Sequence, residues 1–116
     1  MTAMKNVLIV EDEPLIAMMM ENFLESIGRE VAGVADSIAS AMEILAAGGV
    51  DLAILDRNLR SGETSVPIAE ELDRLGIPFV VASGGGIGED PPAYRNRPTL
   101  PKPFTLATME KVLNAL

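Results

Sequence analysis

The sequence contains no cysteine, no tryptophan and no histidine, and aromatic residues make up only 3% of its 116 residues. Without cysteine the chain can form neither a disulfide nor a thiolate metal site, which fits a cytoplasmic protein. With so few aromatic rings, the core must be built from aliphatic side chains and methionine. The length suffices for one domain with a single core, and we expect residues 1–116 to form that domain.

Long apolar runs and basic clusters are missing as well. The first apolar run, residues 7–10, is too short for a signal peptide or a membrane span. Lysine and arginine number 9 against 17 acidic residues, which gives a net charge of −8. An acidic chain without a basic cluster is unsuited to binding a nucleic-acid backbone or an anionic membrane surface. We therefore expect a cytoplasmic protein whose partners are neither nucleic acids nor membranes.

The sequence does contain a regular alternation of short apolar runs with segments of helical periodicity. Continuous apolar runs of this length are typical of parallel strands buried on both faces. They predict strands at residues 7–10, 31–34, 52–55 and 79–82, with a short fifth strand before Lys102. Apolar residues at helical spacing predict helices within residues 15–27, 38–45, 68–75 and 105–116. This alternation predicts an α/β fold with a doubly wound parallel sheet.

Polar residues directly follow most of the predicted strands. Glu11 and Asp12 come after the first strand and Asp56 after the third. Ser83 follows the fourth strand and Lys102 the short last one. In sheets of this kind, ligands bind outside the carboxyl ends of the strands. We therefore expect these side chains to converge at one edge of the sheet.

Each of these residues also has an ordinary structural interpretation. Asp12 and Glu13 precede Pro14, so they could cap a helix that begins there and complement its dipole. Asp56 could form a turn, Ser83 could be a small core residue, and Lys102 could be a solvated loop charge. Together they indicate a site, because carboxylates gathered at one edge would raise one another's pKa unless a cation lay among them. Carboxylates suit Mg²⁺, which also binds phosphate oxygens, and a lysine and a hydroxyl opposite would complete a phosphoryl-transfer site.

Four motifs together resemble the receiver domain of two-component response regulators over essentially the whole chain. They are the acidic pair Glu11-Asp12, the strand-ending aspartate in LAILDRNL, the hydroxyl in VVASG and the KPF triplet, in the family's order and at compatible spacings. The resemblance implies a flavodoxin-like receiver fold, with a five-stranded parallel sheet of strand order 2-1-3-4-5. It also implies a single receiver domain that catalyses only its own phosphorylation and dephosphorylation.

The resemblance implies roles for the site residues. Asp56 would accept a phosphoryl group from a phosphohistidine, Lys102 would pair with the phosphoryl oxygens, and Ser83 would be the switch hydroxyl. The cofactor would be Mg²⁺. Its ligands would be Asp12 directly, Glu11 through a water molecule, Asp56, and Asn58 by its backbone carbonyl.

The implied partners are a sensor histidine kinase and a downstream phosphotransfer or regulator protein. Without histidine, the chain cannot itself be a phosphohistidine donor. After Lys102 only two residues and one predicted helix follow, so we expect no output domain. The signal would leave by protein contact or by removal of phosphate from a shared kinase, and we expect a monomer.

A narrower resemblance is carried by DRNLRSGETSVPIAEEL and IPFVVASGG. These segments are similar to alphaproteobacterial single-domain receivers whose fourth strand carries Pro-Phe-x-Phe-Ala-Thr-Gly-Tyr, a group that includes regulators of general stress phosphorelays. The positions that match or correspond are Pro78, Phe79, Ala82, Ser83 (for Thr) and Gly84. Val81 replaces the second Phe and Gly85 the Tyr. The aromatic switch residue that receivers usually carry three positions before the lysine is Thr99, and Tyr94 lies too far upstream to replace it directly.

Three other interpretations remain open. A phosphatase of the haloacid dehalogenase type also uses a strand-ending aspartate with Mg²⁺, but it needs a second aspartate two residues on, where this chain has Asn58. A flavodoxin-like cofactor binder would share the fold, yet the carboxylates would repel a flavin phosphate. A pseudo-receiver that is never phosphorylated would keep the fold and act only as an interaction module.

Two segments carry local expectations. The receiver resemblance, and the sharp turn needed after the lysine, predict a cis Lys102-Pro103 bond. Residues 84–98 contain four glycines and three prolines, which disfavour a helix. We therefore expect the fourth helix to be short, mobile or absent, with at most one helical turn, and we expect this segment to shift when phosphate draws Ser83 inward.

Overall fold

A five-stranded parallel sheet forms the centre of the structure, a computed structural model that describes residues 6–59, 62–83, 91–95 and 97–116. The spatial order is β2-β1-β3-β4-β5, and neighbouring strands are parallel throughout. The predicted fold class and strand order are therefore confirmed. The strands are β1 (Asn6–Val10), β2 (Glu30–Ala35), β3 (Leu52–Asp56), β4 (Phe79–Ser83) and β5 (Thr99–Pro101).

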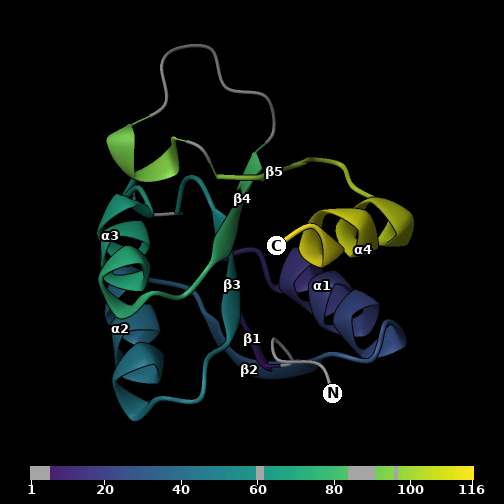
Figure 1. The fold of residues 1–116 in the computed structure, drawn as a ribbon, viewed down its shortest axis with the longest axis horizontal. Helices are drawn as coiled ribbons and strands as arrows, with labels where there is room; N and C mark the ends of the chain where they lie inside the picture. The colour runs from purple at the N-terminus through teal and green to yellow at the C-terminus, as the bar shows by residue number, and fades with distance from the viewer. Residues whose placement is uncertain (1–5, 60–61, 84–90, 96) are drawn as a thin grey trace.

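Helices cover both faces of this sheet. The helices α2 (Ile38–Ala47) and α3 (Val66–Leu75) lie on one face, and α1 (Pro14–Ser26) and α4 (Leu106–Asn114) lie on the other (Figure 1). This arrangement follows from the right-handed crossovers of a parallel sheet, which place the connecting helices on its faces. No helix in the described part of the chain is long and apolar enough to cross a membrane.

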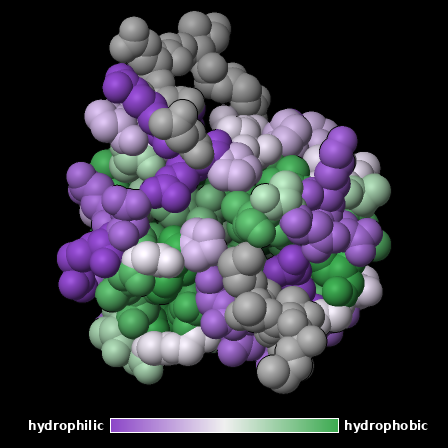
Figure 2. Space-filling view, in the orientation of Figure 1, coloured by the Kyte–Doolittle hydropathy of each residue, from purple (hydrophilic) through white to green (hydrophobic). Residues whose placement is uncertain are grey.

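The core consists of two layers, one on each face of the sheet. Val7 and Ile9 of β1 belong to the layer under α1 and α4, and Leu8 and Val10 belong to the layer under α2 and α3. This alternation is the period-two pattern of a strand that is buried on both sides. On the face shown in Figure 2, hydrophobic residues appear in the middle, between the two layers of helices, and polar residues gather over the outer side of α3.

Local signals fix the ends of several helices. Pro14 is the first residue of α1, where its missing N–H is not needed. At the start of α2, Ser37 and Ser40 form a reciprocal capping box. Gly76 ends α3 in the left-handed conformation with a φ of 73°, which glycine adopts without steric cost.

The connection between β4 and β5 contains only one short helical turn within the residues that are described. This turn is the 3-10 helix η1 (Pro92–Tyr94), which agrees with the expectation of a shortened fourth helix. Residues 84–90 and 96 lie outside the described residues, so the expected mobility of this segment and its response to phosphate stay predictions.

Candidate functional site

The register of the central strands brings two carboxylates together. Val10 of β1 pairs with Leu55 of β3, so the next residues, Glu11 and Asp56, are neighbours at the carboxyl edge of the sheet. The turn after β1 adds Asp12. Carboxylate oxygens of these three residues lie within 4.8 Å of one another, which forms a group that could hold a metal ion.

Lys102 completes this cluster from the other side. It follows β5 directly, and its backbone N–H donates to the carbonyl of Ser83 at 2.9 Å. Its Nζ lies 3.1 Å from Glu11 Oε1 and 3.2 Å from Asp56 Oδ2. One ammonium therefore bridges the carboxylates that end β1 and β3, as their positions after the strands predict.

Glu11 has the most deeply buried carboxylate of the cluster. The residue is only 1% exposed. Burial raises the pKa of its carboxyl to about 7, and its hydrogen bond with Asp56 and the charge of Asp56 act in the same direction. The hydrogen bonds from Lys102 and from the Glu13 amide oppose this rise without cancelling it. The carboxylate form of Glu11 is therefore short of positive charge in its surroundings.

The lysine responds to the same surroundings. Burial alone would lower the pKa of Lys102, but its hydrogen bond to Glu11 and the charges of Asp56 and Glu11 raise that pKa above its ordinary value. Lys102 is thus held as an ammonium, and among the described residues it contacts two of the three clustered carboxylates, Glu11 and Asp56. A small divalent cation with a preference for hard oxygen ligands fits this donor set, and Mg²⁺ is such an ion.

The remaining predicted site residues lie close by in the chain and in the sheet. Ser83 ends β4, one residue after Ala82, which pairs with Asp56. Asn58 lies two residues after Asp56, is exposed, and forms an antiparallel bridge with Thr64. The switch role of the Ser83 hydroxyl and the metal-binding role of the Asn58 carbonyl stay predictions.

The alternative role in helix capping has little support at the start of α1. The N-cap residue is Glu13, and its side chain makes no capping hydrogen bond. Its backbone N–H instead donates to Glu11 Oε2 at 3.2 Å, so the turn supports the buried carboxylate.

The Lys102-Pro103 bond is cis, and that prediction is confirmed.

Apolar side chains border the charged cluster. A groove beside the lysine is lined by Ile16, Met19, Lys102, Pro103 and Phe104. On the same helix α1, Leu15 is 78% and Met18 54% exposed. Large exposed apolar side chains near an apolar groove are typical of protein interaction surfaces.

Sequence analysis did not predict a second polar cluster, which lies beside Asp56. The buried hydroxyls of Ser65 and Tyr94 lie 2.6 Å apart, and both approach the backbone carbonyl of Arg57. Ser65 and Tyr94 are 29 positions apart in the chain. The single tyrosine was the only signal that could have drawn attention to this cluster, and it carries no information about its partners.

Comparison with known proteins agrees with this fold. The sequence model of the response regulator receiver domain family matches residues 7–85. The solution structure of SdrG from Sphingomonas melonis Fr1 is 50% identical, with a TM-score of 0.88, and the match covers 99% of this chain and 98% of that one.

Further relatives are more distant. The receiver domain of the response regulator PhyR from Erythrobacter litoralis is 28% identical with a TM-score of 0.80, over 96% of this chain and 88% of that one. Another similar structure, of the PhyR stress response regulator, is 26% identical with a TM-score of 0.78, over 93% of this chain and 43% of that one. The transcriptional regulatory protein MalR from Bacillus subtilis (strain 168) is 43% identical over 54 residues, which span 46% of this chain but only 23% of that protein.

Proposed function

The chain belongs to the response regulator receiver domain family, and from this premise we propose that it accepts a phosphoryl group from a phosphohistidine onto Asp56 in a Mg²⁺-dependent reaction. One observation carries the proposal. The carboxylates of Glu11, Asp12 and Asp56 form one cluster, and Lys102 reaches two of them within 3.2 Å.

Asp56 is the proposed nucleophile. An oxygen of its carboxylate forms the new bond to phosphorus while the bond between phosphorus and the imidazole nitrogen of the donor breaks. The imidazole leaves with the electron pair and takes up a proton. The side chain of Asp56 is 13% exposed, so it is held by the fold but open to an incoming donor.

The other residues of the cluster bind and neutralise charge. Lys102 presents its ammonium beside Asp56 Oδ2, where it would pair with a phosphoryl oxygen after transfer. Asp12 and Asp56 would hold Mg²⁺ directly, Glu11 through a water molecule, and Asn58 by its carbonyl. When bound, the ion supplies positive charge to the phosphoryl oxygens during transfer.

The proposed biological role is signalling in a two-component pathway by a single receiver domain. The likeness to SdrG and PhyR supports a place in a general stress phosphorelay. The chain would turn over no separate substrate, because the only covalent change occurs on Asp56 itself. Its partners would be a sensor histidine kinase and a downstream phosphotransfer or regulator protein.

Helix α1 offers a surface for the phosphodonor. A phosphohistidine can reach Asp56 only if the donor protein covers the surface around the site. The apolar groove beside Lys102 includes Ile16 and Met19 of α1, and Leu15 and Met18 are exposed on the same helix. We infer that these apolar side chains contact the histidine-bearing domain of the kinase.

The proposal is tested by phosphotransfer from a labelled histidine kinase to the wild-type chain and to Asp56→Asn. We expect rapid labelling of the wild type in Mg²⁺, its loss in EDTA, and no stable labelling of the variant. Undiminished labelling of Asp56→Asn, or transfer that survives EDTA, contradicts the assignment.

A further inference from the structure

Three segments that are distant in the sequence meet at the backbone carbonyl of Arg57, the residue after Asp56. This carbonyl accepts from the N–H of Ser65 at 3.2 Å, and the hydroxyls of Ser65 and Tyr94 lie 3.4 and 3.3 Å from it. The two hydroxyls are 2.6 Å apart. Each hydroxyl has one proton, so one proton joins the hydroxyls and the other is directed to the carbonyl.

Because the cluster is buried, these hydrogen bonds replace the hydration that its hydroxyls lose on folding. Ser65 is 0% and Tyr94 4% exposed. Without partners their hydroxyls would lose hydration with no compensation. The guanidinium of Arg57 also lies over the Tyr94 ring, 5.6 Å from its centre. The turn after the phosphoacceptor is therefore attached to α3 through Ser65 and to η1 through Tyr94.

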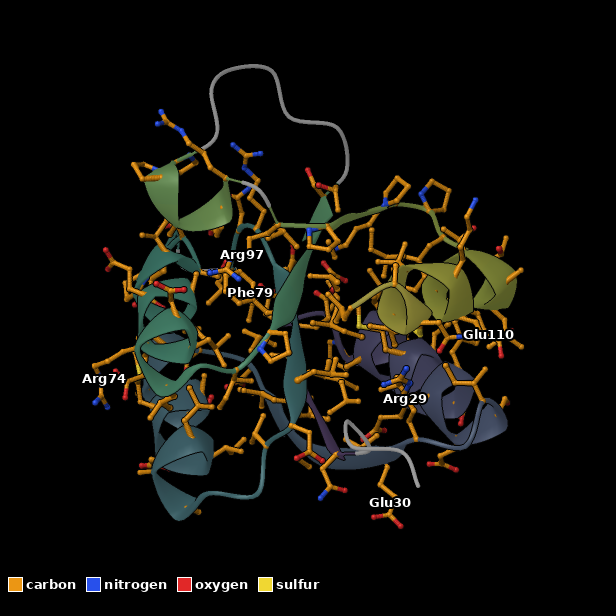
Figure 3. All side chains as sticks on the ribbon, viewed as in Figure 1. Arg29, Glu30, Arg74, Phe79, Arg97 and Glu110 are labelled. Carbon is orange, nitrogen blue, oxygen red and sulfur yellow. The ribbon has the colours of Figure 1, made fainter. Side chains whose placement is uncertain are left out.

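A second contact attaches the chain after η1. Arg97 forms an ion pair with Asp73 of α3, and its guanidinium lies 4.6 Å from the centre of the Phe79 ring (Figure 3). In Figure 1, η1 lies beside the N-terminal end of α3. The end of the β4–β5 connection is thus held at two places, and only the Tyr94 contact reaches the residue next to Asp56.

We propose that Tyr94 is a positioning residue for the phosphoacceptor: with Ser65 it holds the Arg57 carbonyl, and so links occupation of the Asp56 site to the docking of η1. The inference rests on the proposed function of Asp56. This role could not be predicted from the position of Tyr94, which lies five residues before Thr99.

The expected direction follows from preorganisation. A fixed Arg57 carbonyl keeps the Asp56 backbone in one conformation before the phosphoryl group arrives, so less freedom is lost on binding. Loss of the Tyr94 hydroxyl loosens this turn and weakens binding at Asp56. By linkage, binding at Asp56 must favour the docked state of Tyr94 to the same extent.

The sequence supplies a clean spectroscopic probe for this link. The chain has one tyrosine and no tryptophan, so its tyrosine emission comes from Tyr94 alone. Beryllofluoride with Mg²⁺ serves as the phosphoryl mimic, and its binding is followed separately by amide NMR shifts around Asp56. We expect the emission of Tyr94 to change as beryllofluoride binds to the wild type, and to stay constant in Asp56→Asn.

The decisive comparison uses Tyr94→Phe, which keeps the ring over Arg57 and removes the hydroxyl. We expect its apparent affinity for beryllofluoride, measured by NMR, to fall about fivefold, as for the loss of one hydrogen bond. Ser65→Ala is expected to show a similar loss of affinity for beryllofluoride. The double variant is expected to lose less affinity than the product of the two single fold-losses, because both hydroxyls belong to one cluster. The matched control is Thr105→Ala, which removes the capping hydroxyl of α4 and is expected to leave the affinity unchanged.

The outcomes separate the two proposals. If the wild type binds beryllofluoride but Tyr94→Phe binds it equally or more tightly, or if Tyr94 emission does not respond, the positioning role is wrong and the proposed function stands. A drop in Thr105→Ala equal to that in Tyr94→Phe shows a general stability effect and also overturns the positioning role. If beryllofluoride does not bind to the wild type in Mg²⁺, the proposed function fails and the inference falls with it.

Discussion

Glu11 occupies an unfavourable electrostatic position, because its buried carboxylate lies beside Asp56 and its oppositely charged partner among the described residues is Lys102. Burial of like charges costs stability, and a bound cation would remove much of this cost. The cluster is thus arranged for binding at the expense of folding. Single substitutions among the carboxylates should therefore separate the two quantities.

Replacement of Asp12 by alanine is the most informative of these substitutions. We expect Mg²⁺ affinity to fall by more than about tenfold, since even residues that only support metal ligands are worth that much. The melting temperature is expected to stay the same or to rise, because one of three repelling carboxylates is removed. Calorimetric Mg²⁺ titration and thermal unfolding measure the two effects.

Glu13→Ala is the matched control for this prediction. Glu13 is exposed, is adjacent in the chain, and lies outside the carboxylate cluster. The control should bind Mg²⁺ as the wild type does. A large loss of stability in Asp12→Ala with unchanged Mg²⁺ affinity would instead support the helix-capping role of Asp12.

Ionisation of the Tyr94 phenol should make the stability of the fold depend on pH. Burial raises the pKa of its phenol above the ordinary value, and the charge of Asp56 adds to the rise, while the hydrogen bonds from Ser65 and the Arg57 charge oppose it. In the unfolded chain the phenol returns to its ordinary pKa of about 10. The stability that depends on the neutral phenol is therefore complete below that pH and is lost as the pH rises through the pKa of the folded state.

Absorbance of tyrosinate measures this directly, because Tyr94 is the single tyrosine. We expect its titration midpoint in the native protein to lie above the midpoint in denaturant. A native midpoint equal to or below the denatured one would show that the phenol is not buried in the cluster with Ser65 and Arg57.

Helix α1 is the element that we propose contacts the histidine kinase. Leu15→Ser and Met18→Ser should each slow phosphotransfer from the histidine kinase about fivefold or more, as expected for apolar contacts at an interface. Labelling by a small phosphodonor such as acetyl phosphate should not change, because it needs no protein contact. Initial rates with both donors test this prediction.

The control for α1 lies on the opposite face of the sheet. Leu75 at the end of α3 is a comparable exposed leucine, at 42% exposure. Leu75→Ser should leave transfer from the kinase unchanged. Equal slowing in Leu15→Ser and Leu75→Ser, or slowing with acetyl phosphate, would contradict a docking role for α1.

At the scale of elements, the sequence predicted what depends on local pattern. The strands β1, β3 and β4 are continuous apolar runs because they are buried on both faces. The ends of these runs identified Glu11, Asp56 and Ser83 as candidate site residues. The short strand β5 has a single buried residue, Leu100, so it left almost no pattern and was located through the lysine that follows it.

Long-range polar contacts could not be predicted in this way. The hydrogen bond between Ser65 and Tyr94 joins residues 29 positions apart. Arg29, which is 9% exposed, donates to Asn114 across 85 positions. In the sequence these residues resemble ordinary surface or turn residues, because nothing local distinguishes a buried hydroxyl or guanidinium from a solvated one. Only the fold shows which of them meet.

At the scale of the whole molecule, the strand order explains why the site works as one unit. With the order β2-β1-β3-β4-β5, the strands that carry Glu11 and Asp56 are central neighbours, and β4 and β5 bring Ser83 and Lys102 to the same edge. Residues from positions 11 to 102 are thus gathered at one edge of the sheet, as the proposed phosphoryl transfer requires. A net charge of −8 makes a bound cation more necessary for the approach of an anionic donor.

The most direct test of phosphorylation at Asp56 is chemical identification of the modified residue. After phosphotransfer in Mg²⁺, borohydride reduces an aspartyl phosphate to homoserine, which peptide mass spectrometry assigns to a single position. We predict homoserine at position 56 in the phosphorylated chain and none after transfer in EDTA. Homoserine at position 12, or a labelled chain with unmodified aspartate at position 56, would contradict the central role of Asp56.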